Sequence, residues 1–276
     1  MPIFALPFPP IDPVLVEFGP IIIRWYALAY IAGIVLGWQL MRYHVTAELE
    51  WAKAQRRPTL IDLDDVMVIA ALGIILGGRL GHVFFYGLPY YLDHPLEIFQ
   101  VWRGGMAFHG GFLGLILALG IFARAKRIPV LTLFDLLAVA SPIGLFFGRI
   151  ANFINQELWG HPANVAWAVI FPRVDELPRH PSQIYEALAE GLIPFLILNW
   201  IARKGGFRRP GLLAGLFGIL YAVARSICEI FREQDMSETL WGPFTMGMVL
   251  SLPLLIAGFC LVLIALNRPR AGQIKA

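Results

Sequence analysis

Seven apolar stretches constrain the fold of this chain more strongly than any other feature of its sequence. A helix needs about 20 mostly apolar residues to cross the roughly 30 Å hydrocarbon core of a bilayer. Stretches that meet this need in whole or in part lie near residues 21–41, 66–86, 108–124, 131–148, 184–203, 211–231 and 243–266. With 58% hydrophobic and 15% charged residues, the chain lies outside the usual composition of water-soluble domains. We therefore predict an all-α integral membrane protein with seven transmembrane helices.

The positions of lysine and arginine predict the orientation of the chain in the membrane. Basic residues concentrate on the cytoplasmic side of membrane proteins. Alternate connections and the C-terminal tail hold 14 of the 22 basic residues and all four lysines: Arg42, Lys53, Arg56, Arg57, Arg124, Lys126, Arg127, Arg203, Lys204, Arg208, Arg209, Arg268, Arg270 and Lys275. This places the N-terminus outside and the C-terminus in the cytoplasm, which requires an odd number of spans.

The eight basic residues on the outer side are all arginines. Guanidinium groups bind phosphate bidentately, so such a set suits a phospholipid head group. For Arg24, Arg103 and Arg173, an anchoring role at the lipid interface fits equally well.

We expect one membrane domain over residues 1–276 with two appendages. Residues 87–107 mix aromatic and acidic side chains and predict an arm that lies in the membrane interface. Residues 155–183 contain four prolines and predict a small extracytoplasmic cap between spans four and five, with a short strand in WAVIFP. Gly73, Gly77 and Gly81 recur at the spacing that lets helices pack closely. The histidines lack ligand spacing and no CxxC pair occurs, so we expect no metal.

Ionisable residues inside spans are costly and usually face a polar cavity or a partner. Arg79, His82 and Tyr86 form a helical stripe that suits either an interface anchor or a functional face. His109 lies between glycine pairs in GGMAFHGGFLG. It is either a hydrogen-bonded anchor at a helix start or a base that titrates near neutrality. Tyr26 shares a face with small residues, which suits helix packing or the lining of a polar cavity.

Two further polar segments follow apolar runs. In GRIANFINQELWG, a continuing helix would align Arg149, Asn152 and Gln156 on one polar face, although a helix end with satisfied amides is the alternative. Tyr221, Arg225, Glu229 and Arg232 follow at intervals of four, four and three, so they share one stripe. Arg225 and Glu229 can form an ion pair, which is either structural or functional. We expect this stripe, His109 and Arg149 to meet around one cavity in the outer half of the membrane.

The segment GRIANFINQELWG carries a specific family signature, G-R-x-x-N-F-x-N-x-E-x-x-G. Its fixed positions are filled by Gly148, Arg149, Asn152, Phe153, Asn155, Glu157 and Gly160. VWRGGMAFHGG at 101–111, RHPSQIYEA at 179–187 and RSICEIFRE at 225–233 are similar to other motifs of the same family, in the same order. Over nearly its whole length the chain resembles the bacterial prolipoprotein diacylglyceryl transferases.

The resemblance implies a reaction, its partners and a location. The diacylglyceryl group of phosphatidylglycerol would move to the lipobox cysteine thiol in the signal peptide of a preprolipoprotein, forming a thioether and releasing glycerol phosphate. The enzyme would lie in the membrane lipid of the bacterial inner membrane with its active site toward the periplasmic side. Seven spans with the N-terminus outside agree with the count of basic residues. Neither a cofactor nor a nucleic-acid partner is expected.

The same resemblance suggests roles for site residues, because the reaction must hold a phosphate and generate a thiolate. Arg149 would bind the head group, and Arg225 would stabilise the phosphate as charge develops, oriented by Glu229. His109 would act as the base or would position substrate. The remaining candidates would shape the head-group pocket or support it: Asn152, Glu157, Gly160, Tyr26 and Tyr221.

Two other classes of membrane protein would show different sequence features. A transporter or channel would place charges near the bilayer midplane and commonly shows an inverted repeat, which is not visible here. An intramembrane protease would need a GxSxG motif or paired aspartates, but Asp135 stands alone in its span. Both classes are disfavoured.

Overall fold

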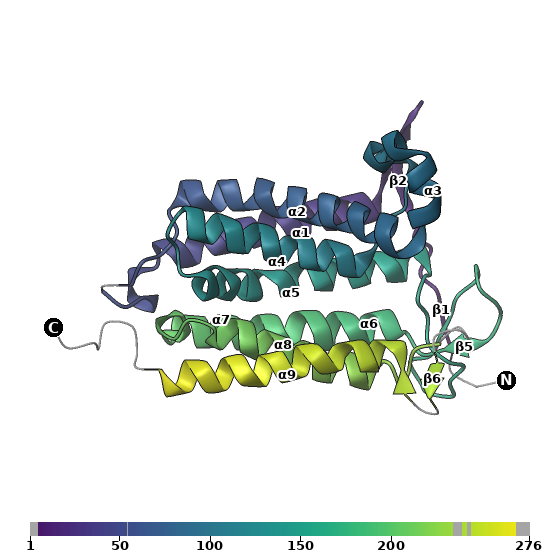
Figure 1. The fold of residues 1–276 in the computed structure, drawn as a ribbon. Coiled ribbons are helices and arrows are strands. Elements are labelled where there is room, and N and C mark those ends of the chain that lie inside the picture. The colour runs from purple at the N-terminus through teal and green to yellow at the C-terminus, as the bar shows by residue number, and fades with distance from the viewer. Residues whose placement is uncertain (1–4, 54, 234–238, 242–243, 269–276) are drawn as a thin grey trace. The chain divides into compact units, whose positions relative to one another are not determined.

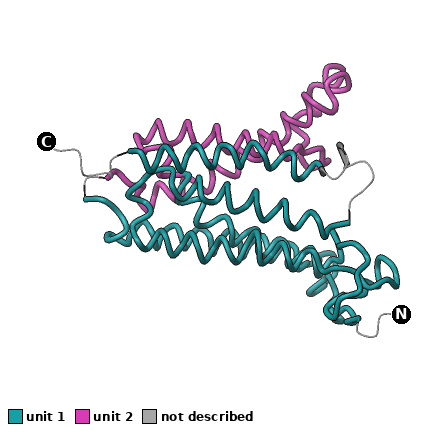
Figure 2. The backbone as a smooth tube through the Cα atoms, turned by 90° about the horizontal axis from the view of Figure 1, so that it is seen from below, with its two compact units in different colours: residues 1–54, 134–276 teal, residues 55–133 magenta. Residues whose placement is uncertain are grey.

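A computed structural model describes residues 5–53, 55–233, 239–241 and 244–268, and this part of the chain is mostly helical. Residue 243 of the last predicted span and two basic residues of the tail, Arg270 and Lys275, lie outside the described residues. The chain divides into two compact units, residues 1–54 with 134–276 and residues 55–133 (Figure 2). Each unit is described by itself.

A helix lies at each of the seven predicted spans (Figure 1). These helices are α1 (Trp25–Thr46), α2 (Leu60–Tyr86), α4 (Phe108–Ala125), α5 (Val130–Asn155), the stretch Ser182–Arg203, α8 (Leu212–Cys228) and α9 (Met246–Asn267). The stretch Ser182–Arg203 consists of α6 (Ser182–Glu186), a π-helical turn (Ala187–Leu192) and α7 (Ile193–Arg203). Among the described residues, four helices are long and apolar enough to cross a membrane: α4, α5, Ser182–Arg203 and α9.

The prediction for the first span is wrong at its start. Residues Ile21–Arg24 form strand β3, which pairs antiparallel with β2 (Val14–Phe18), and helix α1 begins only at Trp25. Gly19 in the connecting turn has a φ of 57°, which a glycine adopts without steric cost. Because β-branched residues favour strands, the isoleucine run continues the hairpin instead of starting the helix.

The unit of residues 55–133 is built on α2 and α4. A Cβ atom added at Gly73 would lie 2.7 Å from the Cβ atom of Ala118, and one at Gly81 would lie 2.8 Å from the Cα atom of Gly110. The close packing predicted from the spacing of the glycines is therefore confirmed. Helix α2 begins with a capping box in which the Asp62 backbone N–H donates to Thr59 Oγ1 over 3.1 Å.

The segment predicted as an arm, residues 87–107, contains three short helical segments. These are α3 (Leu88–Asp93) and two 3-10 turns, Pro95–Phe99 and Val101–Arg103. The exposed apolar side chains of this segment include Leu92, Leu96, Phe99 and Trp102. Buried Arg79 of α2 holds the segment in place, because its guanidinium donates to the carbonyls of Glu97, Ile98, Gly104 and Gly105. Arg79 is therefore a backbone anchor for this segment, while the two roles considered for its stripe with His82 and Tyr86 stay predictions.

The other unit contains α1 and α5–α9, with α8 and α9 side by side (Figure 1). Gly33 of α1 packs against α5, since an added Cβ atom would lie 3.0 Å from the Cα atom of Gly144. Asp135 of α5 is fully buried and accepts hydrogen bonds from the backbone N–H groups of Gly211 and Ala214 over 2.7 and 2.8 Å. It therefore caps the N-terminus of α8, where backbone donors lack helical partners.

The segment 155–183 contributes two strands to a small three-stranded sheet, and the third strand comes from the N-terminal part of the chain. β4 (Val169–Ile170) pairs parallel with β1 (Leu6–Pro7) and antiparallel with β5 (Pro178–Arg179). The short strand predicted in WAVIFP is confirmed.

Candidate functional site

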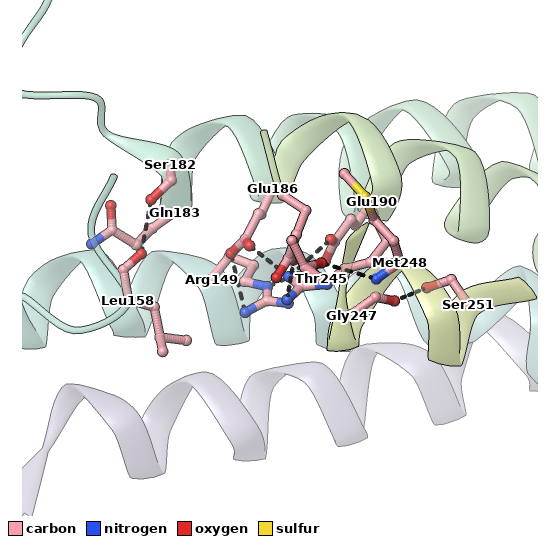
Figure 3. A network of polar contacts seen from close by, with 12 residues as sticks. Arg149, Leu158, Ser182, Gln183, Glu186, Glu190, Thr245, Gly247, Met248 and Ser251 are labelled. Atoms are coloured by element: carbon pink, nitrogen blue, oxygen red, sulfur yellow. Dashed lines mark hydrogen bonds and ion pairs between the residues drawn. The ribbon is translucent and has the colours of Figure 1, made fainter. Parts of the chain in front are cut away.

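A buried ionic cluster joins three helical segments of the unit that comprises residues 1–54 and 134–276. Arg149 comes from α5, Glu186 ends α6, Glu190 lies in the π-helical turn, Arg225 lies near the end of α8, and Glu229 follows that helix. Figure 3 shows the carboxylates of Glu186 and Glu190 directed toward the guanidinium of Arg149. The cluster therefore depends on segments that are far apart in the sequence.

The ion pairs in this cluster are short. Arg149 Nη1 lies 3.1 Å from Glu186 Oε2, and Arg149 Nη2 lies 3.0 Å from Glu190 Oε2. Arg225 Nη1 lies 2.6 Å from Glu186 Oε1 and 3.5 Å from Glu190 Oε1. Arg225 Nη2 lies 2.6 Å from Glu229 Oε2, which confirms the pairing predicted from their spacing. Both arginines thus bind two or more carboxylates.

Local chain geometry brings the two glutamates to Arg149. π-helical turns occur frequently at functional sites because they shift side chains relative to a regular helix. Here the turn contains Gly191, where an added Cβ atom would lie 2.7–2.9 Å from atoms of Phe146 on α5. Only a glycine lets the backbone of the turn approach α5 this closely. Glu190, one residue before this contact, consequently reaches the guanidinium one turn beyond Phe146.

The side chains of the cluster are withdrawn from solvent. Glu186 and Glu190 are fully buried, and Glu229 and Arg225 are 2% and 9% exposed. Charges with this little exposure persist only when they are paired, because desolvation of each ion costs several kcal/mol. The pairing explains how these ionised groups can exist between apolar helices.

Glu186 and Glu190 are not among the site residues predicted from the sequence. Glu186 lies within RHPSQIYEA, and Glu190 follows it by four residues in the apolar stretch predicted as span five. Two acids inside a predicted span are themselves a signal of a polar site. Their partners could not be read from local spacing, because they are on α5 and α8.

The end of α5 differs from a continuous polar helix. The helix ends at Asn155, and Gln156 has a φ of 58°, so the expectation of one face shared by Arg149, Asn152 and Gln156 is wrong for Gln156. Gln156 Oε1 instead accepts from the backbone N–H of Arg173 over 3.0 Å. Asn152 Nδ2 donates to Glu157 Oε2 over 3.1 Å, so these two predicted site residues are in contact.

Gly160 lies where the segment 155–183 contacts the chain that follows α8. Its backbone forms a bridge with Arg232, and an added Cβ atom would lie 2.6 Å from the carbonyl oxygen of His180. Arg179 secures this region by binding Asp175 Oδ2 over 2.6 Å, Glu233 Oε2 over 3.0 Å and the Gly160 carbonyl over 3.1 Å. The Arg179 guanidinium lowers the pKa of the Asp175 carboxyl below its usual value.

The two candidate tyrosines come from different helices. On α1 the Tyr30 hydroxyl donates to Tyr26 Oη over 3.2 Å, and Tyr30 lies within the electrostatic field of Glu157 and Arg149. Tyr221 precedes Arg225 by one turn of α8 and is an electrostatic neighbour of Arg149, Glu190 and Arg225. Tyr221 therefore lies beside the ionic cluster.

His109 is the second residue of α4 and is exposed, with its ring 5.6 Å from that of Phe108. It belongs to the unit of residues 55–133, whereas Arg149 and Arg225 belong to the other unit. The expectation that His109 shares a cavity with both arginines stays a prediction.

An apolar groove of about 480 Å³ begins beside the ionic cluster. It is lined by residues of α1, α5, the π-helical turn and α7, including Leu36, Ile143, Phe146 and Leu192. Phe146 precedes Arg149 by one helical turn, and the lining residue Gly191 follows Glu190 directly. Charged and apolar surfaces that adjoin in this way suit an amphipathic ligand.

Known proteins with similar sequences identify the family. Residues 13–264 match the family described as prolipoprotein diacylglyceryl transferase. A protein of Methylocella silvestris named phosphatidylglycerol–prolipoprotein diacylglyceryl transferase is 52% identical over 96% of this chain and 97% of its own length. Proteins with the same name from Nitrobacter hamburgensis and Rhodopseudomonas palustris are 51% and 49% identical, over 96% and 100% of this chain and 92% and 97% of theirs. The chain therefore belongs to the prolipoprotein diacylglyceryl transferase family.

Proposed function

We propose that this protein transfers the sn-1,2-diacylglyceryl group of phosphatidylglycerol to the lipobox cysteine of a preprolipoprotein, the first step of lipoprotein maturation. The membership of the family and the name of its relatives support the donor, the acceptor and the class of reaction. The single structural observation that carries the proposal is that partly buried Arg149 and buried Arg225 share carboxylate partners beside an apolar groove. This arrangement offers guanidinium groups to a phosphate and an apolar surface to an acyl chain.

The reaction forms one bond and breaks another at a single carbon. The cysteine thiolate attacks the glycerol carbon that carries the phosphate ester, a C–S bond forms, and the C–O bond breaks. The electron pair of the broken bond leaves with glycerol phosphate. The thiol proton moves to a base, for which His109 is the candidate because imidazole titrates near neutral pH. His109 would otherwise hold the substrate in position.

The arginines act where negative charge develops. Arg149 binds the head group of the lipid, and Arg225 stabilises the phosphate as its ester bond breaks. Glu229, 2.6 Å from Arg225 Nη2, orients that guanidinium. Asn152, Glu157 and Gly160 form the wall of the head-group pocket, a role that the contact between Asn152 and Glu157 supports. Tyr26 and Tyr221 support the site from α1 and α8.

The membrane topology belongs to the same proposal. Seven helices cross the bacterial inner membrane with the N-terminus outside, and residues 155–183 form an extracytoplasmic cap. Residues 87–107 lie in the interface, which their exposed Leu96, Phe99 and Trp102 support. The active site faces the periplasmic side.

The function is tested by mixing the purified protein with labelled phosphatidylglycerol and a lipobox peptide. We expect label on the peptide cysteine as a thioether, detected by mass spectrometry, together with released glycerol phosphate. Absence of label with the wild-type protein contradicts the function. In the same assay, His109→Gln is expected to lower the rate about 100-fold or more, the magnitude of a lost general base. A near-normal rate from His109→Gln at neutral and raised pH would show that His109 is not the base.

A further inference from the structure

Arg232 differs from the other arginines around the cluster in its partners. Arg149, Arg179 and Arg225 each bind at least two carboxylates. In the described part of the chain, no carboxylate pairs with Arg232, and its Nε atom is buried without a hydrogen-bond partner. Within the described residues, its guanidinium therefore has no carboxylate partner that an incoming phosphate would have to displace.

The position of Arg232 is fixed by its main chain. Arg232 lies three residues beyond Glu229, and its backbone forms a bridge with Gly160, where the absence of a side chain permits the close approach. Two flanking hydrogen bonds hold this pairing, from the His161 N–H to the Phe231 carbonyl and from the Glu233 N–H to the Trp159 carbonyl, each over 3.0 Å. Arg232 is also within electrostatic range of Glu186, a member of the cluster.

The charges of the cluster favour phosphate binding by an arginine that has no carboxylate partner among the described residues. Glu186, Glu190 and Glu229 contribute three negative charges against two positive charges from Arg149 and Arg225. A phosphodiester brings one more negative charge, and it must compete with carboxylates already held at 2.6–3.1 Å. Phosphate binding by an arginine without a carboxylate partner requires no such exchange.

We propose that Arg232 is a further substrate-binding residue whose guanidinium binds a phosphate oxygen of the phosphatidylglycerol head group. This inference rests on the proposed function and adds a residue to its lipid site. Arg232 balances the third carboxylate in the empty site and supplies the first cation that the incoming phosphodiester meets. Arg149 and Arg225 then act on a phosphate that is already held.

The test compares Arg232→Gln and Arg232→Lys with the wild-type full-length enzyme in detergent micelles. We expect Arg232→Gln to raise KM for phosphatidylglycerol about tenfold, with kcat within about threefold and KM for the lipobox peptide unchanged; tenfold is the effect of about one lost charged contact. Arg232→Lys should recover part of the loss, because the positive charge remains while the planar fork is lost. Arg173→Gln is the matched control, since Arg173 is an exposed arginine of the segment 155–183, with which the backbone of Arg232 pairs at Gly160.

Several outcomes overturn the inference. An unchanged KM for phosphatidylglycerol, or a fall in kcat alone, would show that Arg232 does not bind the donor. Thermal unfolding detects a merely structural role, which would lower the midpoint in both variants without a selective change in KM. Inhibition by free glycerol phosphate distinguishes binding of the lipid phosphate from binding of the product phosphate. Weaker inhibition of Arg232→Gln with an unchanged KM for the lipid would show that Arg232 binds the product and not the donor.

A direct binding measurement keeps this inference separate from the proposed function. Fluorescent phosphatidylglycerol is titrated into the wild type and into Arg232→Gln, with phosphatidylglycerol of the same chain length as competitor. A wild type that binds the lipid but forms no thioether would contradict the function alone. Equal affinities of the two proteins would contradict the role of Arg232 alone.

Discussion

Arginines withdrawn largely or fully from solvent have different kinds of partner in the two units of the molecule. In the unit of residues 55–133, Arg79 donates to main-chain carbonyl oxygens of the segment that follows α2. In the other unit, Arg149 and Arg225 bind the carboxylates of Glu186, Glu190 and Glu229. Burial alone does not distinguish them, since Arg79 and Arg225 are 5% and 9% exposed.

The partners distinguish a structural arginine from a candidate catalytic one. Carbonyl groups of a folded segment are neutral and fixed, so an arginine bound to them anchors the backbone. Carboxylates carry charge, and a phosphate can compete with them for the same guanidinium. The comparison therefore predicts that loss of Arg79 changes stability, whereas loss of Arg225 also changes the chemistry.

The largest effect is expected for Arg225→Gln. The variant leaves Glu186 and Glu229 without their 2.6 Å contacts, so we expect the free energy of unfolding to fall by about 3–5 kcal/mol. The transfer rate should fall about 1,000-fold, because a group that stabilises developing charge is lost. Chemical denaturation and the thioether assay measure the two effects.

A double variant separates stability from chemistry at Arg225. Without Arg225, Glu186, Glu190 and Glu229 share the cluster with Arg149 as its one arginine. Adding Glu186→Gln removes one of these carboxylates, so stability should partly return while the rate stays low. If the double variant regained the transfer rate, Arg225 would be a structural partner like Arg79.

An intermediate effect is expected for Arg79→Gln. Four main-chain carbonyls lose a donor, and each buried acceptor left unsatisfied costs about 1–3 kcal/mol when the chain cannot rearrange. Because some carbonyls will reach water, we expect a net loss of about 2–4 kcal/mol. The rate per folded molecule should stay within about threefold of the wild type.

The matched control in the same unit is Arg103→Gln. Arg103 is 62% exposed at its side chain and pairs with Glu97 over 3.4 Å, so its loss should change stability by less than about 1 kcal/mol. A rate that fell 100-fold in Arg79→Gln without loss of stability would break the comparison between the two units.

The smallest effect is expected for Asp175→Asn, which tests an arginine with both kinds of partner. Arg179 binds Asp175 and Glu233 as well as the Gly160 carbonyl. The Asp175 side chain is 31% exposed, so solvent screening limits the loss of stability to about 1 kcal/mol or less at pH 7.

The sign of the pH dependence follows from the lowered pKa of Asp175. A carboxyl whose folded-state pKa lies below its unfolded value contributes stability above the unfolded pKa, here 3.8, and loses it as the pH falls through the folded pKa. The difference in melting temperature between the wild type and Asp175→Asn should therefore be constant near neutral pH and become smaller below about pH 4. A difference that grew on acidification would contradict this account of the pair.

Much of the helical fold could be predicted from the sequence, because a bilayer-length apolar stretch has few alternatives to a helix. The start of the first helix, expected near residue 21, could not be predicted. An isoleucine run suits a strand as well as a helix, and the turn at Gly19 decides between them. In the candidate site, the pair Arg225 and Glu229 was predictable from its spacing along one helix. Glu186 and Glu190 were not assigned, because their partners lie on other helices.

The sequence by itself determined the helical segments, the close packing of α2 and α4 through their glycines, the family signature and the pairing of Arg225 with Glu229. Each of these depends on local periodicity or on residue identity at fixed spacing. The tertiary structure alone decided that Arg79 anchors a backbone segment, that Asp135 caps α8, and that Glu186 and Glu190 bind both arginines. These roles depend on which helices come together, and a buried charge takes its function from the partner that compensates it.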